Sequence, residues 1–441
     1  MSAKVVSPVP ARPAPPEQAD VARARVHMAM LGARQHYALP ALLHRAGMLG
    51  ALYTDLYAGN KPGLARTLER LPRGLRPVAL ERFLGRTTGA LPVGSVVSFD
   101  SFGLWYAWRS RRMRDAATLN RLYAEAAQRF ARRVIGNGVA GATAVYGYNG
   151  AARELFEWAK PRGIVCILEQ TIAPFARMRE LLAEEQARWP GWEPGAGFEA
   201  DDSFVERERA EWSLADLILA PSQFVLEGLQ HFGVPAEKCC LVPYGIPLEE
   251  FAPGPGVGAR KDSSLRVLFA GGVELRKGAP YLLEALRQLN STRLEARFVG
   301  SIALDAQRLD PYRAWAEFIG PVPRQMMLEH YRWADLLVLP SVCEGSALVT
   351  YEALACGLSL VATPNTGAWI EDGVEGTVVP AGDTDALAAA LDRFLREPDF
   401  LLSCRRNAFA ARPRVGLDAY AQRVLPALRE VLSPQSQERQ A

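Results

Sequence analysis

Two glutamates, Glu344 and Glu352, stand with seven residues between them in the segment CEGSALVTYEALACG, which is otherwise rich in apolar and small residues. Carboxylates are good acceptors of hydrogen bonds from hydroxyl groups. Either glutamate alone is explained by the favourable interaction of an acid with the dipole at a helix N-terminus. The pair lies beside a basic loop in the same predicted region, and together they favour a binding site for hydroxyl groups.

The basic loop belongs to the segment FAGGVELRKGAPYLLEALRQL, which carries Arg276 and Lys277. A strand is predicted to end at Gly271 and Gly272, and a helix to begin near Gly278. Cations at a helix start face the positive end of the dipole, which costs on the order of 0.3 to 1 kcal/mol each when exposed. A bound anion would make this unfavourable free energy favourable. The loop is therefore either a phosphate site built from glycine backbone, helix amides and cations, or a solvated basic loop.

The helix predicted after Glu344 offers a second group of anion acceptors. Ser346 is the expected N-cap, and Gly357 is a typical helix stop. The free amides of the first turn, at Ala347, Leu348 and Val349, would point toward the ligand. Cations and helix termini suit phosphates, whereas carboxylates suit hydroxyl groups. The two loops together predict a ligand with sugars at its ends and a diphosphate between them.

These loops need a parallel sheet to hold them, and the chain alternates short apolar runs with amphipathic stretches throughout. Expected strands cover residues 25–31, 51–57, 142–148, 163–169, 215–221 and 239–245, and then 265–272, 294–300, 316–322, 334–341, 358–364 and 376–380. The segment 251–264, rich in proline, glycine and polar residues, separates the two series. We therefore expect two doubly wound, Rossmann-like α/β domains, over residues 25–252 and 263–412. Ligands of such sheets bind at the carboxyl ends of the strands.

Composition agrees with this architecture, because 441 residues exceed what one hydrophobic core usually organises. The net charge of +3 gives no support for a nucleic-acid partner. Six scattered cysteines lack metal-type spacing, so a reduced, cytoplasmic compartment is expected. Residues 1–24 are rich in proline and alanine and contain no apolar stretch suited to a signal sequence, so we expect a disordered leader.

Four segments resemble, in order, the retaining glycosyltransferases of family 4, the glycosyl transferases group 1. They are SLADLILAPSQFVLEGL, LVPYGIPLEEF, VLFAGGVELRKGAPYLLEAL and the long run from FIGPVPRQ to VVPAGD, covering roughly residues 210 to 400. The resemblance implies the GT-B fold, in which two such domains face a central cleft, with a helix at 416–432 returning to the first domain. It implies that Glu344 holds the hydroxyls of the donor sugar and Glu352 the nucleotide ribose. Lys277 and Arg276 would bind the diphosphate.

The chain departs from this family in three places. Members usually carry an arginine where this chain has Gly272, so Arg276 would supply that charge from another position. Many members place a histidine near the transferring sugar, at the position that falls here on Glu169 or Gln170. We expect Glu169 to contact the sugar in its place; the alternatives are that another residue does so and that Glu169 is a simple exposed acid. The first loop of the amino-terminal domain has Gly32 alone where two glycines are frequent. His36 in this loop is a candidate contact on the acceptor side, although a histidine at a helix start is more often structural or solvated.

The acceptor side contains two basic and apolar stretches, at 61–86 and 105–114. Such mixtures suit the surface of an anionic bilayer, while the alternative is a solvated helical face. The hypothesis is a lipid-linked or glycan acceptor, as in the synthesis of cell-surface polysaccharide or glycolipid. It places the protein in the cytoplasm, with peripheral contact at the inner face of the membrane.

The resemblance implies transfer of a sugar from a nucleotide-diphosphate donor with retention, without cofactor or metal. Asp383 and Asp385 form a D-x-D triplet, a pattern that can hold a metal, but their place before a helix favours capping by Asp383. Further nucleotide contacts are expected near Gly300 and in the segment 320–324. Two alternatives stay open: a nucleotide-sugar epimerase of the same fold, and a non-catalytic binding protein.

Overall fold

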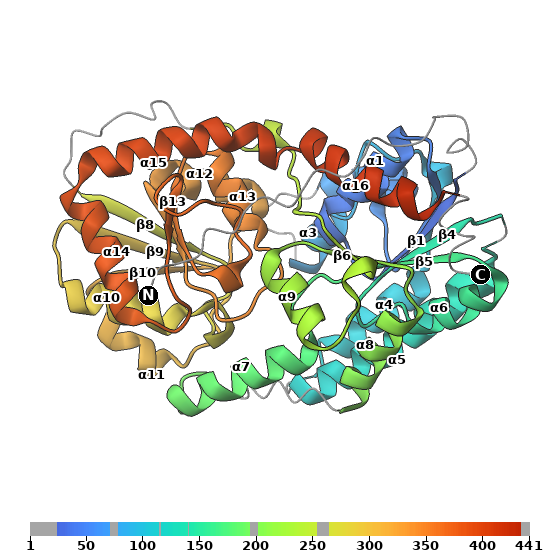
Figure 1. Cartoon of the computed structure of the whole chain (residues 1–441), viewed down its shortest axis with the longest axis horizontal. Coiled ribbons are helices and arrows are strands. Elements are labelled where there is room, and N and C mark those ends of the chain that lie inside the picture. The colour runs from blue at the N-terminus through green and yellow to red at the C-terminus, as the bar shows by residue number, and fades with distance from the viewer. Residues whose placement is uncertain are drawn as a thin grey trace.

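The structure is a computed structural model that describes residues 24–70, 78–113, 116–139, 141–194, 202–253 and 264–433. The leader predicted at 1–24 lies outside these ranges except for its last residue. Most of the separating segment predicted at 251–264 also lies outside them, and so does part of the basic stretch at 61–86. The rest of the chain forms the two α/β units shown in Figure 1.

The amino-terminal domain is built on a seven-stranded parallel sheet in the order β3-β2-β1-β4-β5-β6-β7. The strands are β1 (Val26–Met30), β2 (Leu49–Thr54), β3 (Val96–Ser98), β4 (Ala144–Tyr148), β5 (Val165–Glu169), β6 (Leu217–Ala220) and β7 (Cys239–Leu241). Strands β1, β4, β5 and β6 are buried along their whole length, as expected where helices cover both faces of a parallel sheet.

Nine described α-helices belong to this half of the chain. They are α1 (Ala38–Arg45), α2 (Pro62–Glu69), α3 (Val78–Leu84), α4 (Asp100–Ser110), α5 (Ala116–Asn137), α6 (Arg153–Ala159), α7 (Phe175–Arg188), α8 (Asp202–Leu214) and α9 (Gln223–His231). Strand β3 is an edge strand that the sequence prediction missed, because three residues with one β-branched pair give little periodicity.

The carboxy-terminal domain has a six-stranded parallel sheet in the order β10-β9-β8-β11-β12-β13. Its strands are β8 (Leu265–Ala270), β9 (Leu294–Val299), β10 (Ala316–Gly320), β11 (Leu336–Leu339), β12 (Ser359–Ala362) and β13 (Gly376–Val378). Its helices are α10 (Ala279–Leu289), α11 (Ala306–Leu309), α12 (Arg324–Trp333), α13 (Leu348–Ala355), α14 (Thr384–Arg396) and α15 (Pro398–Ala411). The predicted fold class, two Rossmann-like parallel-sheet domains, is confirmed.

The chain returns to the amino-terminal domain through α16 (Leu417–Val431), which continues the line of α15 along the top of Figure 1. The Ile246 amide donates to the Val415 carbonyl at 2.9 Å. The Arg423 guanidinium donates to the carbonyls of Pro243 and Tyr244 at 3.1 and 3.0 Å. These bonds fix α16 to the segment that leads out of the amino-terminal domain.

Helix α7 makes a second crossing, at the bottom of Figure 1, where it extends from the amino-terminal domain beneath the carboxy-terminal one. Phe175 and Met178 of α7 belong to the same apolar core as Leu275 and Tyr281 of the carboxy-terminal domain. The two domains are therefore joined on opposite sides of their interface, by α16 and by α7.

Candidate functional site

The basic loop and the acidic loop meet at the carboxyl ends of β8 and β11. Arg276 and Lys277 lie in a short 3₁₀ turn, η9 (Leu275–Lys277), which precedes α10. The amide of Val342 donates to the Arg276 carbonyl at 2.9 Å, so the backbones of the two loops are joined directly. The Glu344 carboxylate then pairs with both cations: with Lys277, and with Arg276 at 2.9 Å. The structure thus brings together the three residues predicted for this part of the site.

The two cations are held differently. Arg276 also pairs with Glu274 at 2.7 Å and donates to the Cys343 carbonyl at 3.1 Å. Lys277 lies over Gly271, where a Cβ atom would come within 3.0 Å of its side chain. Burial alone would raise the pKa of Glu344, but Lys277 and Arg276 outweigh it and lower that pKa. Glu344 is therefore an ionised carboxylate, and together with Glu274 it balances the charge of the two cations.

Glycine is required where these strand ends approach one another. Gly278 has a φ of +69°, and a Cβ atom there would lie 2.0 Å from the Pro340 carbonyl oxygen. A Cβ atom on Gly300 would lie 1.9 Å from the Gly271 carbonyl oxygen. Gly271, at a φ of +127°, also has a backbone conformation that other residues rarely adopt. Gly272 has no such conformation, and a Cβ atom there would meet the Glu274 carboxylate at 2.9 Å.

Glu352 lies on α13 and is buried with two partners from α12. Tyr331 donates to its carboxylate at 2.6 Å, and Arg324 does so at 3.2 Å. Burial raises the pKa of Glu352, and Arg324 opposes that effect. Arg324 lies at the end of the predicted contact segment 320–324, but its pairing with Glu352 was not foreseen. Tyr331 was missed entirely, because an aromatic residue on an amphipathic helix is ordinarily a core residue.

The predicted start of the helix after Glu344 is wrong by one residue. Helix α13 begins at Leu348 and its N-cap is Ala347, with no capping side chain. The Ser346 hydroxyl instead contacts the Tyr351 hydroxyl at 2.8 Å and donates to the Gly367 carbonyl at 3.1 Å. The Ala347 amide donates to the Thr366 carbonyl at 3.2 Å, so it is not free for an anion. The neighbouring loop at 363–367 therefore occupies the Ala347 amide and the Ser346 hydroxyl, while Leu348 and Val349 form the first turn of α13.

The acidic loop touches the amino-terminal domain. A Cβ atom on Gly345 would lie 1.8 Å from the Thr171 carbonyl oxygen, so only glycine permits this approach. The Ser222 hydroxyl, at the N-cap of α9, donates to the Gly345 carbonyl at 2.5 Å. Glu344 therefore lies where the two domains meet.

Glu169 and Gln170, at the end of β5, are both buried in the amino-terminal domain. The Glu169 carboxylate accepts hydrogen bonds from the hydroxyls of Tyr146 and, at 2.8 Å, Tyr244, and from the Gln35 amide at 2.7 Å. Burial raises its pKa, and these donors and the nearby Arg34 guanidinium oppose that rise. Gln170 donates to the Glu208 carboxylate at 2.7 Å and accepts from the Trp212 indole at 3.0 Å. Both side chains have protein partners for their polar atoms.

The first loop of the amino-terminal domain contains three consecutive non-glycine residues in the left-handed region: Gln35, His36 and Tyr37, with φ of 45°, 49° and 64°. Such a run is strained and persists only where the surroundings hold it. Gln35 is held by Glu169, and the His36 ring nitrogen lies 2.6 Å from a guanidinium nitrogen of Arg324. The Gly32 amide donates to Asp55 at 3.1 Å. The predicted acceptor-side residue His36 thus contacts the carboxy-terminal domain.

Asp383 accepts a hydrogen bond from the Ala386 amide at 2.8 Å and is the N-cap of α14, which confirms the capping interpretation of the D-x-D triplet. Within the ranges that the structure describes, no group of three or more His, Cys, Asp or Glu side chains is placed to hold a metal ion. In the same ranges, no helix is both long enough and apolar enough to cross a membrane.

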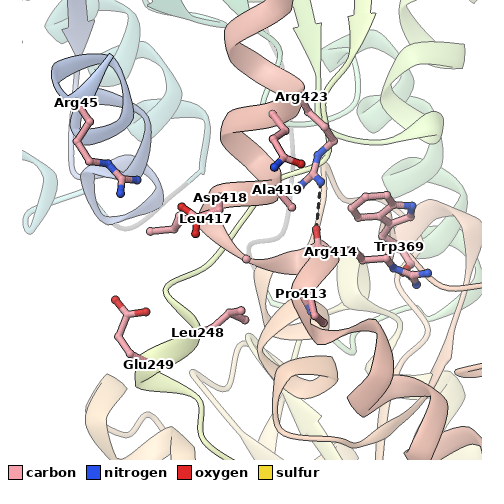
Figure 2. Close-up of a pocket in the computed structure, with 12 residues that line it drawn as sticks. Arg45, Leu248, Glu249, Trp369, Pro413, Arg414, Leu417, Asp418, Ala419 and Arg423 are labelled. Atoms are coloured by element: carbon pink, nitrogen blue, oxygen red, sulfur yellow. Dashed lines mark hydrogen bonds between the residues drawn. The ribbon is translucent and has the colours of Figure 1, made fainter. Parts of the chain in front are cut away.

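A cavity of about 880 Å³ lies outside this cluster, where α16 begins (Figure 2). Arg45, Glu249, Trp369, Arg414 and Arg423 are among its lining residues. The guanidinium of Arg423 lies 4.5 Å from the centre of the Trp369 ring and donates to backbone carbonyls. None of the residues predicted for the donor lines this cavity. We therefore take the loops at the carboxyl ends of β8 and β11 as the candidate site.

Residues 264–397 match the family model described as glycosyl transferases group 1. A D-inositol 3-phosphate glycosyltransferase of Geodermatophilus obscurus is 32% identical over 206 residues, which are 41% of this chain and 46% of that protein. The corresponding protein of Frankia alni is 31% identical over 226 residues, 45% of this chain and 54% of that protein. The chain thus spans about half the length of these curated relatives.

Solved structures match nearly the whole chain. Sucrose-phosphate synthase from Thermosynechococcus elongatus has a TM-score of 0.66 at 18% identity, covering 92% of this chain and 99% of its own. Anabaena HepE in complex with UDP-glucose has a TM-score of 0.56 at 17% identity, with 92% and 99% covered. These likenesses establish the GT-B fold. Residues 264–397 thus resemble the glycosyl transferases group 1, which confirms over this range the resemblance predicted from the motifs.

Proposed function

We propose that this protein is a retaining, metal-independent glycosyltransferase that moves a sugar from a nucleoside-diphosphate donor to a hydroxyl acceptor. The observation that carries the proposal is the cluster of Glu344, Arg276 and Lys277 at the domain interface. The family match, and the structures of Anabaena HepE in complex with UDP and with UDP-glucose, support a nucleotide sugar as the donor.

In the proposed reaction, the bond between the anomeric carbon and the diphosphate oxygen breaks, and its electron pair leaves with the phosphate. Lys277 and Arg276 stabilise the negative charge that grows there. The acceptor oxygen bonds to the anomeric carbon on the same face, and its proton passes to the departing phosphate. Donor binding would release Glu344 from the two cations, because the diphosphate competes for them, and would leave its carboxylate available to the sugar hydroxyls.

Glu352 is proposed to bind the ribose, with Arg324 and Tyr331 holding its carboxylate in place. For Glu169, we propose a structural role in place of the expected contact with the sugar. Its carboxylate already accepts three hydrogen bonds inside the amino-terminal domain, so it fixes the strained loop at 35–37 through Gln35.

The acceptor is proposed to be a glycan or a lipid-linked precursor at the inner face of an anionic membrane. Leu104 and Trp108 of α4 are 64% and 52% exposed, and Arg112 stacks on the Trp108 ring at 3.7 Å. Exposed apolar side chains beside arginines suit an anionic bilayer. Sedimentation with anionic vesicles should remove the protein from solution, while neutral vesicles should not. Equal recovery with both would contradict this part of the proposal.

The donor can be identified by a thermal-shift screen with UDP, GDP, ADP, CDP and dTDP, of which one should raise the melting temperature most. The matching nucleotide sugars are then incubated with candidate acceptors, and the anomeric configuration of the product is determined by NMR. Retention is expected. Consumption of the donor without an added acceptor, with an epimerised nucleotide sugar as product, would instead indicate an epimerase.

A further inference from the structure

The segment 173–193, here called the α7 bridge, begins in the amino-terminal domain and is anchored on the carboxy-terminal domain. Its anchors are polar. The Tyr281 hydroxyl donates to the Glu185 carboxylate at 2.7 Å. Arg188 donates to the same hydroxyl at 2.9 Å and to the Gly382 carbonyl at 3.2 Å. The end of the bridge is therefore fixed to the carboxy-terminal domain.

Aromatic packing strengthens this attachment. The Trp189 ring meets the rings of Trp192 and Tyr281 edge to face, with centroids 5.0 and 5.4 Å apart. The Asp305 amide donates to the Trp192 carbonyl at 2.7 Å. Edge-to-face pairs of this kind add stabilisation to the burial of the rings. Residues 189–192 are thus fixed in place and can hold the residue that follows.

That residue is Glu193, whose carboxylate accepts a hydrogen bond from the Leu275 amide at 2.8 Å. Leu275 is the first residue of η9, the turn that presents Arg276 and Lys277. The first amides of a helical turn have no partner within the turn, so an external carboxylate satisfies one of them. Burial and the nearby Glu274 raise the pKa of Glu193, while Arg276 lowers it.

We propose that Glu193 is a positioning residue for the donor diphosphate, acting through the Leu275 amide on the turn that carries Arg276 and Lys277. This inference rests on the proposed function and deepens it. The end of the α7 bridge, anchored on the carboxy-terminal domain, would thus hold the diphosphate loop in place. Glu193 itself need not touch the nucleotide. Its loss would free η9 to move and would weaken contacts to the diphosphate, leaving the ribose site around Glu352 unchanged.

The test is calorimetric titration of the full chain with UDP and with UMP. Glu193→Ala should weaken UDP binding roughly 5-fold, the effect of one lost hydrogen bond. It should change UMP binding less than about 2-fold, because UMP lacks the terminal phosphate. Glu193→Gln keeps an oxygen acceptor and should restore UDP binding. Glu184→Ala is the matched control, since Glu184 is an exposed acid on α7. If UDP does not bind the unaltered protein, the nucleoside diphosphate selected by the thermal-shift screen and its monophosphate replace the pair.

The outcomes separate this inference from the proposed function. If the unaltered protein binds none of the five nucleoside diphosphates, the proposed function is wrong, and this inference falls with it. If it binds one and Glu193→Ala binds it equally well, only the positioning role is overturned. Equal weakening of diphosphate and monophosphate, together with a lower melting temperature, would show a general structural role and would also overturn the proposal.

Discussion

The two sides of the interface hold their acidic residues in opposite ways. On the carboxy-terminal side, Glu344 is paired with Arg276 and Lys277, which lower its pKa. On the amino-terminal side, Glu169 accepts from Tyr146, Tyr244 and Gln35, and burial raises its pKa. Cations paired with a carboxylate can exchange that carboxylate for an anionic ligand. A carboxylate satisfied by buried neutral donors holds the fold together.

The largest effect is expected from Lys277→Ala. Removing a cation from the leaving phosphate should lower the transfer rate about 100- to 1,000-fold. The variant should keep its melting temperature within a few degrees, because Arg276 still pairs with Glu344. Initial rates of transfer and a thermal melt measure both quantities. As a control, Lys238→Ala removes a cation of the amino-terminal domain that is not part of the candidate site. This variant should transfer the sugar at the normal rate. Turnover by Lys277→Ala at the normal rate would place the diphosphate elsewhere.

Gly345→Ala tests whether the two sides must touch for transfer to occur. The added methyl group would overlap the Thr171 carbonyl and force the loops apart. A misplacement of about 1 Å in a reacting site can lower the rate about 100-fold. Transfer should fall by that order, while nucleoside diphosphate binding should weaken far less. Gly136→Ala, on α5 with open space around it, is the control. Unchanged transfer by Gly345→Ala would mean that the contact has no part in catalysis.

Glu169→Ala distinguishes a structural carboxylate from one that contacts the sugar. Three donors would lose their acceptor, and the free energy of unfolding should drop by about 2–3 kcal/mol. Glu169→Gln keeps an acceptor oxygen and should be more stable than the alanine variant. Urea unfolding and transfer assays should be compared for both variants. A stable Glu169→Gln protein that cannot transfer would restore the original expectation that this residue contacts the sugar.

The smallest effect concerns His36, which lies at the exposed rim of the interface and faces Arg324 and Glu250. Burial and Arg324 lower its pKa, and Glu250 opposes them. A lowered pKa means that the unfolded chain binds the proton more readily. The stabilisation by neutral His36 is therefore complete above its unfolded pKa of about 6.5 and is lost as the pH falls through the folded value.

The urea concentration at the unfolding midpoint should rise between about pH 5 and about pH 7.5. This rise should be smaller in His36→Gln than in the unaltered protein. His44→Gln provides the control, since His44 is exposed on α1 away from Arg324. An identical pH dependence in the His36 variant and the unaltered protein would show that this contact does not form in solution.

The site residues of the carboxy-terminal side could be predicted well because the local spacing of residues in the sequence identifies them. Glu344, Arg276 and Lys277 lie in loops that follow buried strands, and parallel topology brings those strand ends together. The start of α13 could not be predicted, since the Ala347 amide and the Ser346 hydroxyl find their partners in the loop at 363–367. Those bonds depend on how β12 is placed in the sheet, which no local pattern reveals.

The amino-terminal side was predicted less well, and for a physical reason. Glu169 resembles an exposed acid at a strand end, but its three donors come from β4, from the segment after β7 and from the first loop. The crossing of the α7 bridge was also missed. Amphipathic spacing predicts a helix there. It does not predict that the end of this helix packs against Tyr281 in the other domain.

The most direct measurement is the crystal structure of the protein in complex with the nucleoside diphosphate that the thermal screen selects. The account predicts the terminal phosphate within hydrogen-bonding distance of the Lys277 ammonium and a ribose hydroxyl on the Glu352 carboxylate. It also predicts that Glu344 has separated from the two cations. A nucleotide bound instead in the cavity lined by Arg45 and Arg423, or bound with the Glu344 ion pairs intact, would contradict it.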